Sequence, residues 1–233
     1  FSATYPAEIK RMSASIQRDP VEVSVDVAHT QANIEQLYFE IDKDRRLEAL
    51  ATLLGHYQPQ SCVIFCNTKQ RCDEVAEHLQ HLGYHALALH GDLDQKERDQ
   101  VLVQFANQSA SILIATDVAA RGLDIDNLAA VVNFELSRQP EVYVHRIGRT
   151  GRAGQAGVAV SLIAHKEKYL FEEVKELTGE ELLMQWFPGF EPDFMAQEEE
   201  DRGKRKPSKK SLRAKALGEH KGSKARTNKR RRR

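Results

Sequence analysis

Residues 145–154, HRIGRTGRAG, gather four side chains that can carry positive charge within ten positions. They are His145, Arg146, Arg149 and Arg152. Like charges at this spacing repel each other by roughly a few tenths of a kcal/mol per pair, so the cluster favours an anionic partner. A planar arginine fork donates two hydrogen bonds at once to a phosphate. The segment therefore indicates a phosphate-binding site.

On a helix that turns about 100° per residue, His145, Arg149 and Arg152 share one face, and Arg146 lies beside it. Three interleaved glycines make this an imperfect helix and allow a ligand to approach the backbone closely. The alternative is a solvated basic helix end whose arginines pair with carboxylates of the same chain. The glycines and the position after a predicted strand favour the anion site.

The elements that position this cluster follow from an alternation of apolar runs and amphipathic stretches. The apolar runs predict strands over 35–41, 62–66, 85–90, 111–116, 129–134 and 157–163. The amphipathic stretches predict helices over 5–15, 43–57, 69–83, 94–108, 140–148 and 165–179. Such alternation is typical of an α/β protein with a parallel sheet covered on both faces. Ligands bind beyond the carboxyl ends of these strands, where 66–71, 90–95, 115–125 and 133–141 lie.

The net charge of zero averages two different regions of the 233 residues. From Arg202 onward there are 16 of the 34 Lys and Arg but one acid, Glu219, which leaves 18 basic and 33 acidic residues before it. Residues 202–233 contain no aromatic side chain, so they cannot bury enough apolar surface to offset chain entropy. We expect a disordered basic tail.

Three cysteines, Cys62, Cys66 and Cys72, lack the spacing and the second ligand pair of a zinc site, so no metal site is expected in this chain. No window approaches the roughly 20 apolar residues of a membrane helix, and no secretory signal is present. These features predict a cytoplasmic protein without a membrane partner. The sequence begins at Phe1 in what reads as the middle of a structure, so we expect a longer protein.

Five motifs, FSAT, VIFCNT, LHGDLDQKER, ATDVAARGLDI and HRIGRTGRAG, occur in this order. The set resembles the second, C-terminal RecA-like domain of DEAD-box ATP-dependent RNA helicases, especially bacterial DbpA-like members. The resemblance covers roughly residues 1–180 and implies a RecA-like three-layer sandwich with a mostly parallel central sheet. The implied organisation is the end of a first helicase domain at 1–19, a linker at 20–33, the C-terminal domain at 34–180 and an extension at 181–233.

The resemblance assigns nucleotide-binding and catalytic roles by position. Arg149 and Arg152 match arginines that reach the γ-phosphate of ATP across the domain cleft, with Arg152 as the arginine finger. His145 and Arg146 match the part that ties this motif to the facing domain. Asp124 matches the acid that hydrogen-bonds the ribose, although a plain turn former is the alternative there.

RNA contacts are implied at the sugar and phosphate backbone, which carries no base identity. The matching positions are Asn67, Thr68, Gly91, Gln95, Arg98, Thr116, Arg121 and Gly122. Gln95 and Arg98, at i and i+3, share a helix face near its N-terminus, where phosphate is favoured, with a solvated helix start as the alternative. Ser2 and Thr4 match a motif that couples nucleotide state to unwinding, and either hydroxyl also suits a helix cap.

The sequence contains neither a GxxxxGK[ST] phosphate loop nor an Asp-Glu-Ala-Asp motif. We therefore expect the lysine and the Mg²⁺ ligands for ATP in the missing first domain, and we expect this chain to be inactive alone, with Arg149 and Arg152 lacking partners. The alternatives are a non-motor RNA-binding or chaperone module that acts through the basic tail, and a purely structural interaction domain. Precursor ribosomal RNA is one candidate substrate, and ribosome biogenesis is the process to which it belongs. The sequence shows no RNA-recognition strand after Trp186, so this substrate stays an open prediction.

Overall fold

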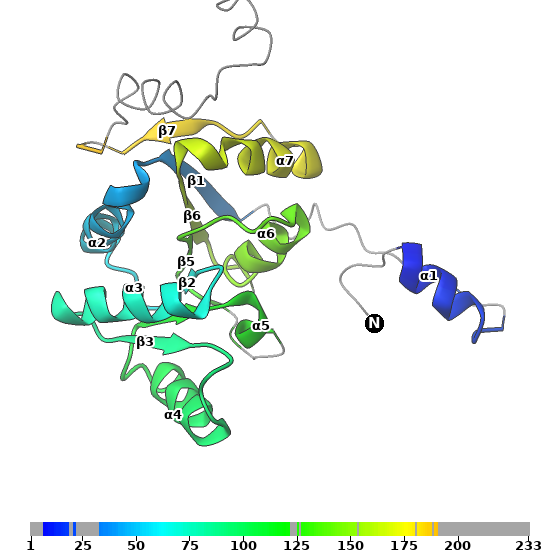
Figure 1. The fold of residues 1–233 in the computed structure, drawn as a ribbon, viewed down its shortest axis with the longest axis horizontal. Helices are drawn as coiled ribbons and strands as arrows, with labels where there is room; N and C mark the ends of the chain where they lie inside the picture. Colours follow the sequence, from blue (N-terminus) through cyan, green and yellow to red (C-terminus); the bar gives the residue numbers. More distant parts are fainter. Residues whose placement is uncertain are drawn as a thin grey trace, which may run out of the picture.

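The computed structural model describes residues 7–18, 21, 33–121, 125, 127–152, 154–179, 181–187 and 189–190. Seven strands form one sheet in the order β3-β4-β2-β5-β6-β1-β7, and every neighbouring pair is parallel (Figure 1). The strands are β1 (Ile34–Glu40), β2 (Cys62–Phe65), β3 (Ala86–Leu89), β4 (Ile112–Ala115), β5 (Ala130–Asn133), β6 (Gly157–Ile163) and β7 (Met184–Trp186). The six predicted strands are confirmed, with ends that differ by at most one residue.

Helices connect the strands and match the amphipathic stretches of the sequence. They are α1 (Ala7–Ala14), α2 (Arg46–Tyr57), α3 (Lys69–His81), α4 (Gln95–Ala106), α5 (Asp117–Ala120), α6 (Pro140–Ile147) and α7 (Lys168–Thr178). Short 3-10 turns, η2 (Lys43–Arg45) and η3 (His165–Glu167), precede α2 and α7. The short helix α5 is not predicted from the sequence, because four residues are too few to show a helical period.

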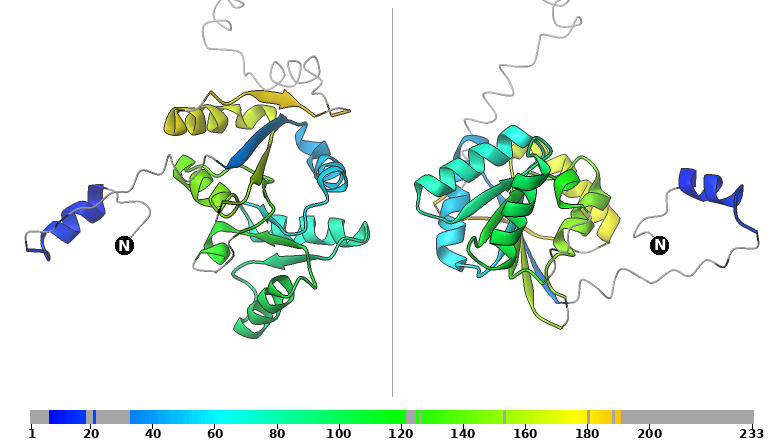
Figure 2. Two further views of the ribbon diagram at one scale, coloured as in Figure 1. Left: turned by 180° about the vertical axis from the view of Figure 1, so that it is seen from behind. Right: turned by 90° about the horizontal axis from the view of Figure 1, so that it is seen from below.

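Apolar clusters on both faces of the sheet confirm the predicted three-layer sandwich. On one face, α2 and α3 pack on alternate residues of β1, β2, β4, β5 and β6. On the other face, α4 and α5 cover β2, β3, β4 and β5, while α6 and α7 cover β1 and β6. Figure 2 shows the sheet from behind and from below, between these helices. Because both faces are covered, β2, β4 and β5 are buried at every position.

Polar residues set the start of the helices at the carboxyl edge of the sheet. The Thr68 hydroxyl accepts a hydrogen bond from the Arg71 backbone N–H and caps α3. Asp94 and Glu97 form a reciprocal capping box at the start of α4. Pro140 occupies the first turn of α6, where its missing N–H is no loss. The helices therefore begin close to the strand ends that carry the candidate site residues.

The ordered fold continues past the boundary expected at residue 180. Strand β7 pairs with β1, so it forms an edge of the sheet. Phe187 and Phe190 pack into the α2 and α3 core, and the Arg45 guanidinium lies 4.4 Å from the centre of the Phe190 ring. These aromatic side chains stabilise this end of the sheet by burying apolar surface. The strand is not predicted from the sequence, because three residues are too few to show a strand period.

Several predictions fall outside the described residues. These are the coupling residues Ser2 and Thr4, the positions Gly122 and Asp124, and the tail from 191 to 233. The N-terminal helix expected over 5–15 is present as α1. No helix in the described part of the chain has the length and apolar character needed to span a membrane.

Candidate functional site

A cleft of about 610 Å³ opens at the carboxyl edge of the sheet, beyond β2 and β4 and between α5 and α6. Its walls are formed by Phe65, Asp117, Ala120, Arg121, Gln139, Glu141, Val142, His145, Arg146 and Arg149. Phe65 ends β2, and Asp117 begins α5 two residues after β4. The cleft lies where the parallel sheet predicts ligand binding.

Arg146 is the most enclosed side chain of the cleft wall, with 2% of its surface exposed. Its Nε and Nη2 atoms donate to the two carboxylate oxygens of Asp117 at 2.7 and 2.8 Å. Nη1 donates to the side-chain oxygen of Asn133 and to the Glu135 carbonyl, at 3.1 and 2.7 Å, and Nη2 also donates to Asn67 Oδ1 at 3.1 Å. These five bonds use all five guanidinium N–H groups.

This bonding pattern ties Arg146 to its own domain. A guanidinium whose donors are all satisfied by buried acceptors has none left for a phosphate. The bidentate pair with Asp117 also neutralises its charge inside the protein. Arg146 therefore joins α6 to β5 and to the loops that follow β2 and β4.

The four cationic residues do not share a helix, so the predicted helical face is wrong. Helix α6 ends at Ile147, with Gly148 as its C-cap, and Arg149 and Arg152 follow in a loop. His145 is exposed on α6 and lines the cleft together with Arg149. Arg152 does not line it, and its Nε atom donates to the Gly148 carbonyl. Arg149 and Arg152 both take part in interactions within the chain, so the expectation that they lack partners is also wrong.

The loop that carries these arginines is fixed by close backbone packing. Gly151 has φ +67°, and a Cβ there would lie 2.5 Å from Ile34 Cγ1. A Cβ on Gly157 would lie 2.1 Å from Thr150 Oγ1 and 2.4 Å from the Gly151 nitrogen. The buried Thr150 hydroxyl donates to the Leu128 carbonyl. Glycine is required at both positions by space and, at Gly151, by conformation as well.

Asn67 and Thr68 lie at the end of β2 and have partners of different kinds. The Asn67 side chain donates to the Leu136 carbonyl at 2.8 Å and accepts from Arg146, so its amide group is used within the domain. The Thr68 hydroxyl accepts from the Arg71 N–H as a helix cap, which leaves its O–H free to donate to a ligand. Both residues are exposed at the surface.

The other predicted RNA-facing residues lie along the same edge. The Thr116 N–H donates to the Leu89 carbonyl at 3.3 Å, which places the ends of β4 and β3 side by side. Gly91 follows β3 and has no atom within 4 Å of where a Cβ would lie. Gln95 and Arg98 both lie in the first turn of α4, as predicted.

Three contacts hold α4 and the loop before it against neighbouring helices. The Arg98 guanidinium donates to the Ala119 carbonyl at 3.4 Å and so links α4 to α5. His90 Nε2 lies 2.8 Å from Asp73 Oδ1, and Lys69 pairs with Asp92 across the same gap between α3 and the β3–α4 loop. Arg121 is exposed and lines the cleft.

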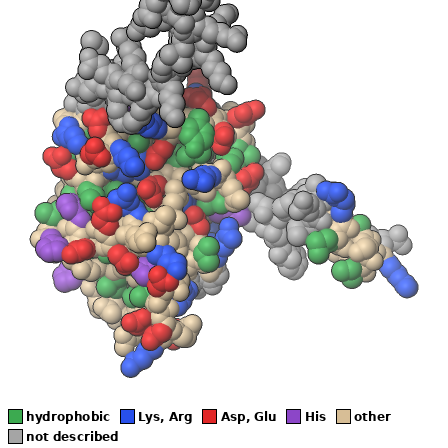
Figure 3. All heavy atoms as spheres, viewed as in Figure 1, with side chains coloured by type: hydrophobic (Ala, Val, Ile, Leu, Met, Phe, Trp, Pro, Cys, Tyr) green, Lys and Arg blue, Asp and Glu red, His purple; other side chains and the backbone are tan. Residues whose placement is uncertain are grey.

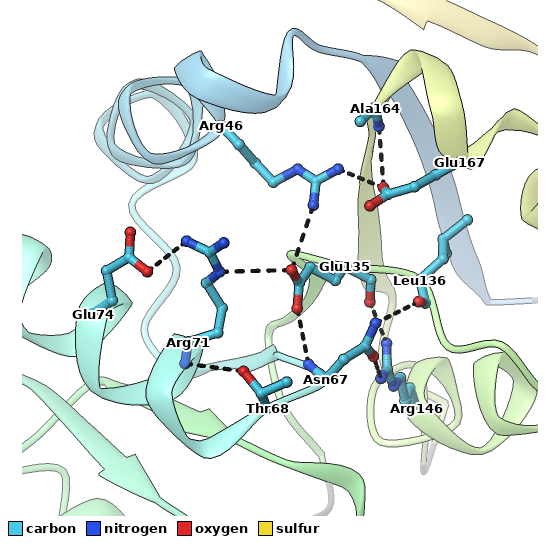
Figure 4. A network of polar contacts seen from close by, with 10 residues as sticks. All are labelled: Arg46, Asn67, Thr68, Arg71, Glu74, Glu135, Leu136, Arg146, Ala164 and Glu167. Carbon is cyan, nitrogen blue, oxygen red and sulfur yellow. Dashed lines mark hydrogen bonds and ion pairs between the residues drawn. The ribbon is translucent and has the colours of Figure 1, made fainter. Parts of the chain in front are cut away.

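Glu135 occupies the centre of a polar network at this edge (Figure 4). Its carboxylate accepts from the Asn67 backbone N–H at 3.1 Å and lies 3.6 Å from Arg71 Nε and 3.9 Å from Arg46 Nη1. Arg46 is 3% exposed and also pairs with Glu167. The network connects α2 and α3 on one face of the sheet with α6 on the other.

Buried thiols occupy β2 and α3, the elements that flank Asn67. Burial raises the pKa of Cys62 to about 12. A hydrogen bond with Cys72, together with burial, raises the pKa of Cys66 well above its ordinary value. All three cysteines are free and buried, and the described residues hold no cluster of three or more His, Cys, Asp or Glu suited to a metal ion.

Comparisons with known proteins agree with this geometry. Residues 45–154 match the helicase conserved C-terminal domain family. The chain is 53% identical to ATP-dependent RNA helicase DbpA of Escherichia coli K12, over 72% of this chain and 36% of the relative. The solved structure of E. coli DEAD-box protein SrmB bound to regulator of ribonuclease activity A superposes with a TM-score of 0.65 at 30% identity, over 76% of this chain and 98% of that one. The chain belongs to the DEAD-box helicase family.

The described domain is thus a DEAD-box C-terminal, RecA-like helicase domain, as the motif order predicts. A structure of Saccharomyces cerevisiae Dbp5 bound to RNA and ADP BeF3 has a TM-score of 0.72 at 30% identity, over 86% of this chain and 53% of that one. The chain spans about 36% of the length of its DbpA relative.

Sequence reasoning on this DEAD-box domain missed the acidic partners of its arginines. Asp117 and Glu135 each follow the end of an apolar strand by two residues, and each binds a buried arginine. An acid two residues beyond a buried strand is a usable signal, since the carboxyl edge collects polar side chains. Arg46 and Arg71 carried no such signal, because arginines in amphipathic helices are usually solvated.

Proposed function

We propose that this chain is the C-terminal half of an ATP-dependent RNA helicase. In this proposal it binds the RNA backbone and supplies Arg149 and Arg152 to the phosphates of ATP, which a first RecA-like domain holds. Closure of the two domains around ATP and RNA then leads to hydrolysis and local duplex unwinding. The chain by itself is expected to be inactive, because it contains only one wall of the nucleotide site.

The observation that carries the proposal is the difference between the buried arginine and the other basic side chains of the cleft. Arg146 is satisfied by its own domain, whereas His145, Arg121 and Arg149 line an open cleft at the carboxyl edge. Basic side chains on an open cleft suit a polyphosphate presented from the other side. The S. cerevisiae Dbp5 structure is bound to both RNA and ADP BeF3, which supports the same pair of ligands for this chain.

Arg152 is proposed as the arginine finger although it lies outside the cleft of this domain. Its Nε atom donates to the Gly148 carbonyl in the loop that follows α6, and a guanidinium group can donate two hydrogen bonds at once to a phosphate. A finger stabilises the negative charge that develops on the transferred phosphoryl group. Domain closure would bring that charge to Arg152 and so gate hydrolysis.

The proposed RNA surface is the row of exposed residues beyond the carboxyl ends of β2, β3 and β4. Thr68, Gly91 and Gln95 are exposed there. Contacts of these types with sugar and phosphate give RNA binding without sequence preference. Precursor ribosomal RNA is a candidate substrate on the strength of the DbpA-like sequence.

ATP with Mg²⁺ is the proposed cofactor pair. The basic cleft fits the phosphates, and Mg²⁺ would neutralise charge on the phosphoryl oxygens when it is bound. We assign its ligands to the first domain, which is also expected to hold the phosphate loop. The part played by this chain is to present arginines to the nucleotide and to orient the RNA.

The proposal is tested by RNA-stimulated ATPase activity of the full-length protein with Arg152→Ala. We expect kcat to fall about 10³-fold, because a finger is worth roughly 10³ to 10⁵ in rate where it has been measured in GTPases. Arg45→Ala is the matched control, because Arg45 lies in η2, does not line the cleft and forms a largely exposed ion pair with Glu48. That variant should stay within about twofold of the wild type, since exposed ion pairs contribute little.

Near-normal turnover of Arg152→Ala contradicts the finger assignment. Absence of ATPase activity in the full-length wild type, together with RNA binding that is lost when residues 202–233 are deleted, supports a non-motor module instead. A salt titration accompanies the deletion, because binding by a basic tail falls steeply with salt.

A further inference from the structure

Glu135 joins the cleft to the candidate RNA-binding loop, and the proposed mechanism does not yet use it. It lies in the loop between β5 and α6, two residues beyond the end of β5. Its backbone carbonyl accepts from Arg146 at 2.7 Å, while its carboxylate accepts from the backbone N–H of Asn67 at 3.1 Å. One residue therefore holds a cleft arginine through its main chain and the β2–α3 loop through its side chain.

A second connection runs in parallel through Asn67. The Asn67 side chain accepts from Arg146 and donates to the carbonyl of Leu136, the residue after Glu135. Arg146, Glu135 and Asn67 thus form a closed ring of hydrogen bonds, as Figure 4 shows. A displacement of Arg146 therefore affects two hydrogen bonds of Asn67. One runs from its main-chain N–H to the Glu135 carboxylate, and the other from Arg146 to its side-chain oxygen. Thr68, whose hydroxyl caps α3, is the next residue in the loop.

The carboxylate of Glu135 is oriented from the opposite face of the sheet. Arg46 on α2 and Arg71 on α3 both approach it, and both guanidinium groups also lie over the Phe134 ring, 5.6 and 6.0 Å from its centre. Two cations on one carboxylate fix its rotamer more tightly than a single surface pair does. Glu135 is 16% exposed, so solvent screens these interactions only in part.

Stability alone does not favour this arrangement. The Nε atom of Arg46 is buried and has no hydrogen-bond partner within the described residues. An unsatisfied buried donor costs free energy, and buried ion pairs are often no more stable than apolar residues of the same volume. A charged cluster that keeps an unsatisfied buried donor, despite its unfavourable free energy, is typical of a positioning role.

We propose that Glu135 is a positioning residue that couples occupancy of the nucleotide cleft to RNA binding at the Asn67–Thr68 loop. The inference rests on the proposed helicase function. When Arg146 shifts as the cleft closes on a ligand, Glu135 transfers the shift to the Asn67 main chain and so to Thr68. By reciprocity, RNA bound at Thr68 favours the closed position of Arg146.

The first test measures the structural link directly by amide hydrogen exchange of this chain. Glu135→Gln removes the charge but keeps the shape, so Arg46 and Arg71 no longer orient the group. We expect exchange at the Asn67 amide to rise about tenfold. The matched control is Glu74→Gln, which removes the other, more exposed carboxylate partner of Arg71 and should change that exchange by less than about twofold. Equal exchange in the wild type and Glu135→Gln contradicts the proposal.

The second test measures coupling in the full-length protein as the ratio of RNA affinities with and without ADP–beryllium fluoride. We expect Glu135→Gln to reduce this ratio about tenfold, while nucleotide affinity without RNA changes less than twofold. A merely structural defect would weaken both ligands together. Glu74→Gln should keep the wild-type ratio.

The outcomes separate the two proposals. A wild-type protein in which nucleotide does not tighten RNA binding contradicts the helicase function, and the coupling role is then wrong as well. A coupled wild type with equally coupled Glu135→Gln leaves the helicase function standing and overturns only the role of Glu135. Thermal unfolding checks each variant. Glu135→Asp, which keeps the charge on a shorter side chain, replaces Glu135→Gln if that variant does not fold, with a smaller effect in the same direction expected.

Discussion

The two halves of residues 140–154 use the same amino acid in opposite ways. In the helical half, α6, Arg146 is 2% exposed and donates five hydrogen bonds to four residues of its own domain. In the loop half, residues 148–154, Arg149 lines the open cleft. Charge alone therefore does not mark a ligand contact. Arg146 holds neighbouring elements of the domain together, whereas Arg149 forms part of the cleft wall in the loop.

The helical period explains which residue of α6 is buried. Tyr143, Arg146 and Ile147, at i, i+3 and i+4, form the inner stripe, and His145 is exposed. An arginine in a core stripe requires acceptors, and Asp117 and Asn133 at the ends of β4 and β5 supply them. The surface of the domain is different: Figure 3 shows acidic and basic side chains intermingled over the face in view.

The largest expected effect is the loss of Arg146. Arg146→Ala leaves the Asp117 carboxylate without its partner, and breaking a buried ion pair in this way costs about 3 to 5 kcal/mol. Because Asp117 is 23% exposed, we expect a loss in unfolding free energy near the lower end, about 3 kcal/mol. Arg149→Ala should cost less than about 1 kcal/mol. Urea denaturation of the chain measures both, and equal losses would break the distinction between the halves.

A smaller effect tests how the loop half is held. Gly157→Ala places a methyl group 2.1 Å from Thr150 Oγ1 and 2.4 Å from the Gly151 nitrogen, so the loop must shift. Overpacking of this kind costs about 1 to 3 kcal/mol. Gly91→Ala is the stability control, because its methyl group meets no atom within 4 Å and should change the unfolding free energy by less than about 0.5 kcal/mol.

The position of Arg149 gives a second readout of the same variant. If the packing of Thr150 and Gly151 orients the loop half, Gly157→Ala should also shift the amide resonances of residues 148–152 while those of α6 stay in place. Shifts of similar size in both halves would show that the two halves move as one unit.

The sequence is sufficient for the framework of the site. Continuous apolar runs such as CVIF and ILIA predict buried parallel strands, and the rule that ligands lie beyond their carboxyl ends locates the cleft correctly. The motif order predicts the DEAD-box family, which the comparisons show. Both signals are local in sequence or rest on many residues at once, so small errors at element ends do not affect them.

Side-chain partners are less accessible from sequence. Extending the helix of α6 through the three glycines put Arg149 and Arg152 on its face, although the chain leaves the helix at Gly148. Pairing of Arg146 with Asn67 spans 79 positions and depends on the sheet order, which a single sequence does not specify. The roles of Arg149, Arg152 and the RNA-facing residues stay predictions.

The smallest expected effect, counted per pH unit, concerns strand β2. Strand β2 carries Cys62 and leads into Asn67, which Arg146 holds, whereas residues 148–154 contain no cysteine. Burial raises the pKa of Cys62 from 9.0 to about 12, so the folded state keeps the thiol protonated at pH values where the unfolded chain releases the proton. The corresponding stabilisation is complete below pH 9 and is lost as the pH rises toward 12.

Urea denaturation at a series of pH values from 9 to 12 measures this loss. One proton contributes at most about 1.4 kcal/mol per pH unit to the slope of unfolding free energy against pH. Cys62→Ala removes the contribution, so its slope should be shallower than that of the wild type by up to this amount. Tyrosines and lysines titrate in the same range, but their contribution is common to both proteins and cancels in the difference. Identical slopes would show that the Cys62 thiol titrates alike in the folded and unfolded states, which contradicts its protection by burial.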